Sequence, residues 1–258
     1  MKTGKQILPS SSFPEVWYDY VDLEHFWIKW RFRVVVEALK LAGLEFNSKQ
    51  EVLDVGAGNG IVRAQLEALT KWKVDCTELN ANTVRNIRPG RGETFRYDIL
   101  DRQPALAAKY DVVMAFDVLE HIKDTHPFVE ALFYHLKPGG LLLLNVPALP
   151  ILFSDYDRVQ SHFRRYTKSS LRRELSFLNS AQVLHISYWG FSLVPIAALR
   201  KLWMSFQSQR DPNEIMRRGF EPPKKWLNRL LASLSTVETT LLNSPPAGTS
   251  LLLTARKR

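Results

Sequence analysis

Three glycines in one short segment, Gly56, Gly58 and Gly60, form the part of the sequence best suited to holding a small ligand. They follow an apolar run at 52–55 and precede an apolar-periodic stretch at 61–69, which predicts a strand, a tight loop and a helix. Because glycine has no side chain, the backbone of such a loop can approach a ligand closely, at the point toward which the N–H groups of the helix N-terminus are directed. The segment therefore predicts a ligand-binding loop at the end of a strand.

Two carboxylates come after the next apolar runs of the chain. Glu78 could accept hydrogen bonds from both hydroxyls of a ribose, and Asp98 could accept one from an adenine amino group. The dinucleotide fingerprint G-x-G-x-x-G requires its third glycine at the position that Ile61 occupies. The spacing therefore disfavours NAD, although a glycine turn alone is also compatible with an ordinary strand–helix connection.

The elements that must position these residues alternate between apolar runs and helical segments. Strands are expected at 52–55, 73–77, 94–97, 111–116, 141–146, 183–188 and 250–256. Helices are expected at 14–41, 61–69, 82–87, 127–136, 169–178 and 193–242, with a turn at 137–140 and a polar loop at 154–165. Continuous apolar strands separated by helices are typical of a parallel sheet that is covered on both faces. The predicted fold class is a doubly wound α/β fold.

Six segments in order resemble the motifs of class I S-adenosylmethionine (SAM)-dependent methyltransferases. They are LDVGAGNG (53–60), CTELN (76–80), RYDILD (96–101), YDVVMAFDVLEHI (110–122), LKPGG (136–140) and LLLLNVP (141–147). The resemblance implies a Rossmann-like sheet of seven strands, mostly parallel, with the last strand antiparallel. It also implies SAM as the cofactor and S-adenosylhomocysteine as its product.

The same resemblance implies where the cofactor lies. The glycine loop receives its methionine end, Asp54 orients that loop, Glu78 holds the ribose, and Asp98 with Ile99 flanks the adenine. His25-Phe26-Trp27 and Arg31 resemble a lid helix of one subgroup, in which the arginine is available to the cofactor carboxylate; a helix that packs its tryptophans on the core is the alternative. The expected cofactor-binding residues are Arg31, Asp54, Gly56, Ala57, Gly58, Gly60, Glu78, Leu79, Asp98, Ile99, Phe116 and Asp117.

A methyl acceptor with an O–H or N–H group needs a base, and three residues are expected near it. Residues 155–166 resemble the D-x-x-x-x-x-H-x-R-R-Y loop of the same subgroup, which follows the fifth strand. His162 is the first candidate, His121 the second, and Tyr166 ends the loop motif. A structural hydrogen bond that holds the loop is the alternative role for each histidine.

Other polar residues are interpreted as structural. Asp155 and Asp157 could form an acid–base pair, but we interpret them as a solvated loop face. His126, His135 and His185 have no metal-ligand spacing, and the only cysteine, Cys76, is interpreted as a core residue. No metal site is predicted.

The net charge of +9 over 258 residues is distributed unevenly. Residues 1–159 carry 19 Lys and Arg against 21 Asp and Glu, whereas residues 160–258 carry 16 against 5. The basic part includes Arg200, Lys201, Arg210, Arg217, Arg218, Lys224, Lys225 and Arg229, interleaved with Trp189, Phe191, Trp203, Phe206 and Trp226. Basic amphipathic helices with tryptophans are typical of segments that bind an anionic membrane surface; a helical cap packed on the core is the alternative.

These observations predict a lid at 1–48, a SAM-binding core at 49–188 with an acceptor loop at 154–166, a basic helical insertion at 189–248 and a closing strand at 249–258. The start of the chain lacks a signal-peptide core and 183–199 is too short to span a bilayer, so we expect a cytoplasmic protein that contacts membranes only peripherally. The predicted function is methyl transfer to a small-molecule or lipid-linked acceptor. An RNA methyltransferase is one alternative, but residues 145–148 lack the N/D-P-P-Y/F motif, so nucleic acid is not expected as a partner. A non-catalytic SAM-binding or membrane-attached protein is the other.

Overall fold

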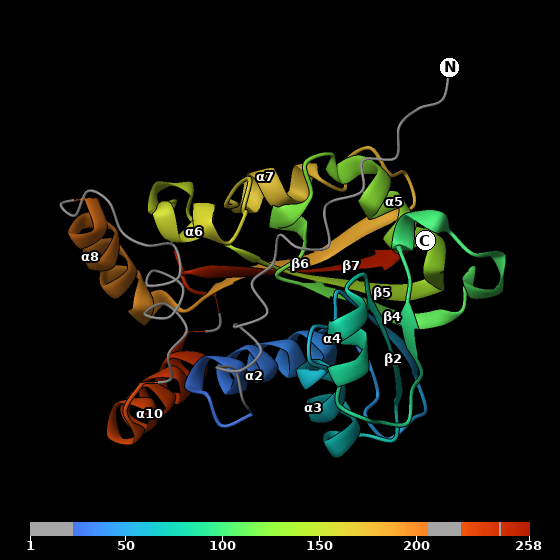
Figure 1. Ribbon diagram of the computed structural model, residues 1–258, viewed down its shortest axis with the longest axis horizontal. Coiled ribbons are helices and arrows are strands. Elements are labelled where there is room, and N and C mark those ends of the chain that lie inside the picture. The colour runs from blue at the N-terminus through green and yellow to red at the C-terminus, as the bar shows by residue number, and fades with distance from the viewer. Residues whose placement is uncertain (1–22, 206–222, 243) are drawn as a thin grey trace.

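A seven-stranded sheet forms the centre of the computed structural model, which describes residues 23–205, 223–242 and 244–258 (Figure 1). The strands are β1 (Glu51–Val55), β2 (Lys73–Glu78), β3 (Thr94–Arg96), β4 (Tyr110–Phe116), β5 (Leu136–Pro147), β6 (Ala181–Trp189) and β7 (Ser250–Lys257). Their order is β3-β2-β1-β4-β5-β7-β6, and β7 runs antiparallel to both of its neighbours while the other pairs are parallel. The predicted doubly wound, mostly parallel sheet with an antiparallel last strand is confirmed.

Helices cover both faces of this sheet, which explains the continuous apolar strands. Val52 and Met114 point into one buried cluster, and their sequence neighbours Leu53 and Val113 point into the other. The first cluster is covered by α2 (Phe26–Leu41), α3 (Ile61–Leu69) and α10 (Lys225–Leu241), and the second by α5 (Thr125–His135) and α7 (Lys168–Arg173). Because both faces are buried, apolar side chains are favoured on both sides of a central strand.

The order of the strands brings the glycine loop and the later motifs together. From β1 the chain passes outward to β2 and β3, and it then returns to the other side of β1 as β4 and β5. Ligands in open α/β sheets bind outside the carboxyl ends of the strands at such a reversal. The loop at 56–60 and residues 117–121 follow strands that end there, and Glu78 is the last residue of β2.

Three local predictions differ from the structure. The predicted loop at 154–165 contains α6 (Asp155–Val159), which begins at Ser154 in a capping box with Asp157. The predicted turn at 137–140 lies within β5. It forms an irregularity there, because the register against β4 shifts between the pairs Tyr110–Leu136 and Val112–Leu141. The helix predicted at 169–178 ends at Arg173, and single-turn hydrogen bonds follow it.

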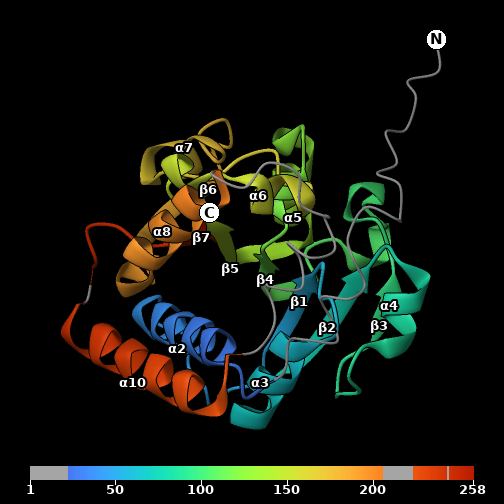
Figure 2. The ribbon, with the colours of Figure 1, turned by 60° about the vertical axis from the view of Figure 1, so that its left-hand side comes forward.

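In place of the single helix predicted at 193–242, the structure has the two helices α8 (Val194–Ser205) and α10. Residues 206–222 lie outside the described part of the chain. Residues 14–22 of the predicted N-terminal helix also lie outside it. Helix α10 lies along α2 (Figure 2). The Asn228 side chain accepts a 2.9 Å hydrogen bond from the Phe26 N–H and donates one to the Glu24 carbonyl. Glu238 accepts 2.8 Å hydrogen bonds from the backbone N–H groups of Phe191 and Ser192. Polar side chains thus attach α10 to the domain.

An apolar stripe of α10 faces away from the domain. It includes Trp226, which is 64 % exposed, and Leu241, which is 73 % exposed, with Leu230, Leu234 and Val237 between them. On α8, Ile196 and Leu199 are also exposed. Among the helices in the described ranges, none is long and apolar enough to cross a bilayer.

Candidate active site

The glycine loop turns sharply from β1 into α3. Gly56 and Gly60 have φ angles of 69° and 75°, in the left-handed region that favours glycine. A Cβ atom on Gly56 would lie 2.7 Å from a methyl carbon of Val118, so the loop packs directly against the segment that follows β4. The Gly56 and Ala57 N–H groups donate to the Thr77 carbonyl, which ties the loop to the end of β2.

Glu78 lies at the end of β2 and holds the glycine loop. One of its carboxylate oxygens accepts a 3.0 Å hydrogen bond from the Gly58 N–H, and the other accepts one from the Leu79 N–H. Burial raises the pKa of Glu78, although the backbone N–H groups of Gly58, Leu79 and Asn80 oppose this effect. The carboxylate and the loop are therefore brought together as the sequence predicts.

The predicted adenine-binding residues follow β3 at the same edge of the sheet. Asp98 accepts a 3.0 Å hydrogen bond from the Leu100 N–H and so begins a short 3-10 helix, and Ile99 is buried. Leu79 and Leu100 are large apolar side chains that remain exposed here. Leu100 was not predicted as a site residue, and its exposure is the signal that identifies it.

Asp54 is buried near the charged side chains of Arg31, Arg63 and Glu78. One of its carboxylate oxygens has no hydrogen-bond partner among the described residues. Burial raises its pKa to about 7, even though the guanidinium groups of Arg31 and Arg63 act in the opposite direction. A buried carboxylate with an unused oxygen is suited to receiving a cationic group of a ligand.

Arg31 reaches from α2 to the end of β4. Its guanidinium donates a 2.7 Å hydrogen bond to the Asp117 carboxylate and lies over the rings of Trp27 and Phe116. The other Asp117 oxygen accepts from the Asn145 side-chain amide, which in turn accepts from the Trp189 indole N–H. Sequence reasoning did not predict Asn145 as a site residue, and it grouped Trp189 with the aromatic residues of the basic insertion. Trp189 is instead buried, because the fold brings the ends of β5 and β6 beside Asp117.

Both tryptophans of the predicted lid helix lie against Trp189. The ring centroids of Trp27 and Trp30 are 5.5 and 5.8 Å from that of Trp189. The alternative in which α2 packs its tryptophans on the core therefore describes the structure, and the same helix also directs Arg31 toward the site.

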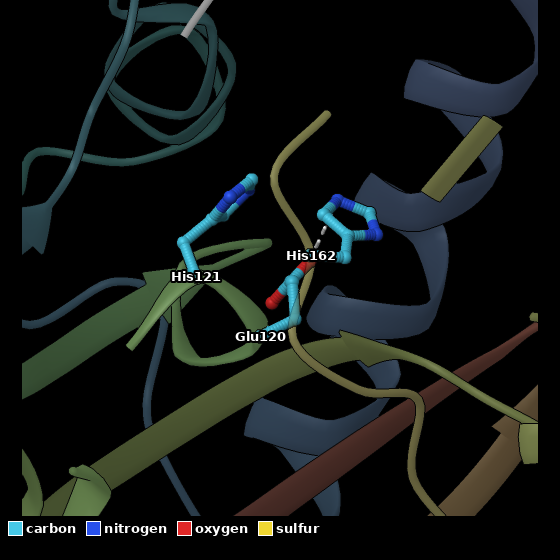
Figure 3. A group of neighbouring side chains, drawn as sticks. All are labelled: Glu120, His121 and His162. Atoms are coloured by element: carbon cyan, nitrogen blue, oxygen red, sulfur yellow. Dashed lines mark ion pairs between the residues drawn. The ribbon is translucent and has the colours of Figure 1, made fainter. Parts of the chain in front are cut away.

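Glu120, His121 and His162 converge on one point beside this network (Figure 3). The His162 Nε2 atom lies 4.0 Å from a Glu120 oxygen, and the two imidazole rings are 4.7 Å apart between centroids, edge to face. Burial, together with the Asp117 carboxylate, raises the pKa of Glu120 well above its usual value. Burial also lowers the pKa of His121 to about 3, so this imidazole is neutral and weakly basic at physiological pH.

Asp157 fixes the orientation of His162. Its carboxylate lies 3.1 Å from the His162 Nδ1 atom and accepts hydrogen bonds from the Ser154 N–H at 2.9 Å and from the Arg165 Nε at 2.7 Å. Burial alone would raise the pKa of Asp157, but His162 and the Arg165 guanidinium lower it to about 2. The interpretation of Asp157 as part of a solvated loop face is wrong, because it is 0 % exposed. Asp155 is exposed and pairs with Arg158.

The remaining predicted polar residues have structural surroundings. Tyr166 is 1 % exposed, and its hydroxyl is directed at the Leu119 carbonyl, 3.5 Å away, so we assign it a structural role instead of the predicted catalytic one. His135 lies 2.9 Å from the Tyr97 hydroxyl inside the core, and Cys76 is a buried strand residue as predicted. The catalytic candidates that the structure brings together are His121 and His162, with Glu120 as a neighbour that the sequence did not predict.

Known proteins resemble this chain in sequence and in fold. Residues 27–217 match a family described as "Methyltransferase domain". A ubiquinone biosynthesis O-methyltransferase of Rickettsia canadensis is 30 % identical over 101 residues, which are 38 % of this chain and 43 % of the relative, so the match covers less than half of the relative's length.

Two solved structures share the fold. A Haemonchus contortus phosphoethanolamine N-methyltransferase 2 in complex with SAM has a TM-score of 0.54 at 18 % identity, over 86 % of this chain and 51 % of the other. A SAM-dependent methyltransferase from Archaeoglobus fulgidus has a TM-score of 0.51 at 15 % identity, over 87 % and 94 % of the two chains. Since the family match extends over most of the sequence, this chain belongs to the family described as "Methyltransferase domain" and has the class I methyltransferase fold.

Proposed function

We propose that the chain methylates a hydroxyl oxygen of a small acceptor that carries an apolar, lipid-like part. The observation that carries this proposal is the pairing of His162 with Asp157 beside Glu120 and Asp117, which provides a fixed imidazole next to the end of β4. An oxygen acceptor is further supported by the names of the relatives, which are ubiquinone biosynthesis O-methyltransferases.

The cofactor residues predicted from the sequence are proposed in the same roles. The glycine loop with Ala57 receives the methionine part of SAM, Glu78 the ribose hydroxyls, and Asp98 the adenine amino group. Leu79 and Ile99 supply apolar contacts beside it. The unused oxygen of Asp54 and the absence of a Cβ atom on Gly56 fit a cationic group brought close to the backbone.

Arg31 is proposed to hold the carboxylate of the cofactor, with Asp117 as its permanent partner and Phe116 beneath its guanidinium. A guanidinium has five donors and can serve both carboxylates at once.

His162 is the proposed base. The bound cofactor supplies an already activated methyl group, so the protein aligns the acceptor and receives its proton. Because Asp157 is held ionised, its oxygen accepts the Nδ1 proton of His162 and leaves the lone pair on Nε2, on the side of Glu120. His121 is the weaker candidate, because its low pKa makes it a poor base.

The lipid-like part of the acceptor suggests a membrane contact. Helix α8 follows β6, whose carboxyl end lies at the same edge of the sheet as those of β4 and β5. The exposed apolar stripe of α10 begins beside Lys224 and Lys225, and Arg229 lies within the first turns of the helix. We propose that this surface docks on an anionic bilayer, where cations and apolar side chains both contribute. Arg210, Arg217 and Arg218 belong to the same predicted insertion but lie outside the described residues.

The test is to incubate the purified chain with methyl-labelled SAM and cell extract and then to separate lipid, RNA and water-soluble fractions. Label in the lipid fraction, released by treatment that cleaves methyl ethers, supports the proposal. Label in RNA would support the alternative enzyme class instead, and no label in any fraction would favour a non-catalytic SAM-binding protein. His162→Gln should lose the label, whereas His126→Gln, an exposed histidine on α5, is the matched control.

A further inference from the structure

Glu120, His121 and His162 form a group whose composition is that of a metal site. Each residue offers one ligand atom, and these three atoms lie within 4.8 Å of one another. Glu120 and His121 are consecutive in a single 3-10 turn, whereas His162 comes from the loop after β5 (Figure 3). Two chain segments that are some forty residues apart thus direct nitrogen and oxygen ligands to the same point.

The Glu120 carboxylate is buried and incompletely hydrogen-bonded. It is 1 % exposed, and its Oε2 atom has no hydrogen-bond partner among the described residues. The nearest cation-forming group to its Oε1 atom is His162, at 4.0 Å, which is too long for a hydrogen bond. The Glu120 backbone N–H and the Arg165 guanidinium favour the charged form of this carboxylate. An unsatisfied oxygen on a buried carboxylate is still costly, so either a proton or a bound cation belongs at this position.

Both imidazoles are oriented by outer hydrogen-bond partners, as the histidines of metal sites are. The Nδ1 atom of His162 pairs with Asp157, and the Nε2 atom is left toward Glu120. His121 interacts with the backbone at Gln160 and Ser161. Carboxylate and carbonyl partners of this kind fix the tautomer and ring orientation of metal-binding histidines.

We propose that Glu120, His121 and His162 bind one divalent transition-metal ion of the zinc class, beside the acceptor. Two imidazole nitrogens and one carboxylate form a donor set known for Zn²⁺ and for iron, and such a set leaves positions open for a further ligand. Metal bonds of about 2.0–2.2 Å place ligand atoms about 3.0–3.5 Å apart, so the most widely separated ligand atoms would move together by up to about 1–2 Å around the ion.

The site has a chemical use that rests on the proposed function. A hydroxyl of the acceptor could occupy an open position on the ion, where its pKa falls and its proton can pass to water. With the ion bound, the Nε2 lone pair of His162 is committed to the metal, so His162 acts as a ligand of the ion. In the metal-free chain the same lone pair is the base of the proposed function.

The test uses the purified chain, stripped with a chelator and titrated separately with Zn²⁺ and Co²⁺. We expect one equivalent per chain by calorimetry, and intense visible absorption bands from bound Co²⁺. Glu120→Gln and His162→Ala should abolish both signals, and Asp157→Asn should weaken binding about 10–100-fold. Glu130→Gln and His126→Gln, which alter an exposed glutamate and an exposed histidine on α5, should bind like the wild type. Binding of S-adenosylhomocysteine by each variant verifies that it is folded.

The outcomes separate this inference from the proposed function. If the stripped chain binds neither ion at micromolar concentrations, or if Glu120→Gln and His162→Ala bind as tightly as the wild type, the metal site is refuted. Label in the lipid fraction under these conditions would leave the proposed methyl transfer standing. If the ions bind through these residues but no acceptor is labelled with metal present, the metal site stands and the proposed function fails.

Discussion

The Arg31 guanidinium and the Asp117 carboxylate form a 2.7 Å ion pair that joins helix α2 to the end of β4. Arg31 is almost fully buried, and Asp117 keeps part of its surface exposed on the side of the site. The pair continues through Asn145 to Trp189, so one network connects the N-terminal helix to three strands of the sheet.

Replacing Arg31 should therefore affect both stability and cofactor binding. In Arg31→Met the apolar packing against Trp27 is retained, but Asp117 loses its cation. We expect a loss of about 1–3 kcal/mol in the free energy of unfolding, the scale for a hydrogen bond between charged groups. Urea titration measures this loss. Calorimetry with S-adenosylhomocysteine should show weaker binding by a similar amount. Lys29→Met, which removes an exposed charge of the same helix, is the control. Unchanged cofactor affinity in Arg31→Met would remove Arg31 from the proposed cofactor site.

Glu78→Ala should weaken SAM binding by about 1–3 kcal/mol, because a hydrogen-bonding carboxylate is removed from the proposed ribose site and from the Gly58 N–H. Isothermal calorimetry measures the change, with NAD as a ligand that should not bind. Glu93→Ala alters an exposed carboxylate of the neighbouring loop and should leave the affinity unchanged. Equal affinities of Glu78→Ala and the wild type would contradict the assignment.

His162→Ala should lower the rate of methyl transfer about 10²–10⁴-fold, the range for losing a group that acts on a proton, while cofactor binding survives. Single-turnover measurements with the labelled acceptor and calorimetry with S-adenosylhomocysteine separate the two effects. A rate within a few-fold of the wild type would reduce His162 to a residue that holds the loop through Asp157.

Much of this site follows from the sequence because its parts are local. The apolar runs end where Gly56 and Glu78 begin their loops, and sequence spacing alone places both at one edge of a parallel sheet. Helix α6 was missed because its capping residues, Ser154 and Asp157, stand in a polar segment of only five helical residues. The convergence of Glu120 with His162 depends on the path of the chain between β4 and the loop after β5, which no local pattern specifies.

The orientation of α10 could not be predicted for a different reason. Its sequence has an apolar stripe, and such stripes usually face the core. In the structure Asn228 and Glu238 face inward because backbone N–H groups near α2 and β6 need acceptors, and this turns Leu230 and Val237 toward solvent.

The affinity for SAM should rise with pH up to about pH 7. Without ligand, burial holds the pKa of Asp54 at about 7, so much of the carboxyl is protonated at pH 6. The positively charged groups of SAM favour the ionised form, so the pKa of Asp54 is lower in the complex. At pH values between that lowered pKa and 7, binding therefore releases a proton. In this window the affinity should increase up to about tenfold per pH unit, and it should be flat above it. Calorimetry at several pH values, in buffers with different ionisation enthalpies, measures both the slope and the proton. Asp54→Asn should remove the slope, and a slope that persists in this variant would assign the proton to another group.

The exposed stripe of α10 should bring the chain to acidic bilayers. Vesicles that contain anionic lipid should co-sediment the chain at low salt and less of it at high salt, because each nearby Lys or Arg contributes about 1 kcal/mol that salt screens. Lys224→Glu combined with Lys225→Glu should weaken binding at least about tenfold. Trp226→Ser with Leu230→Ser should remove the part of the binding that persists at high salt, since apolar insertion is not screened.

The matched control is Arg172→Glu with Arg173→Glu on α7, which reverses the same number of exposed charges on the opposite face of the sheet. If this control weakens binding as much as the α10 variant does, the attraction comes from net charge alone. If the wild type does not bind acidic vesicles at low salt, α10 is only a cap on α2, and a water-soluble acceptor becomes the better proposal.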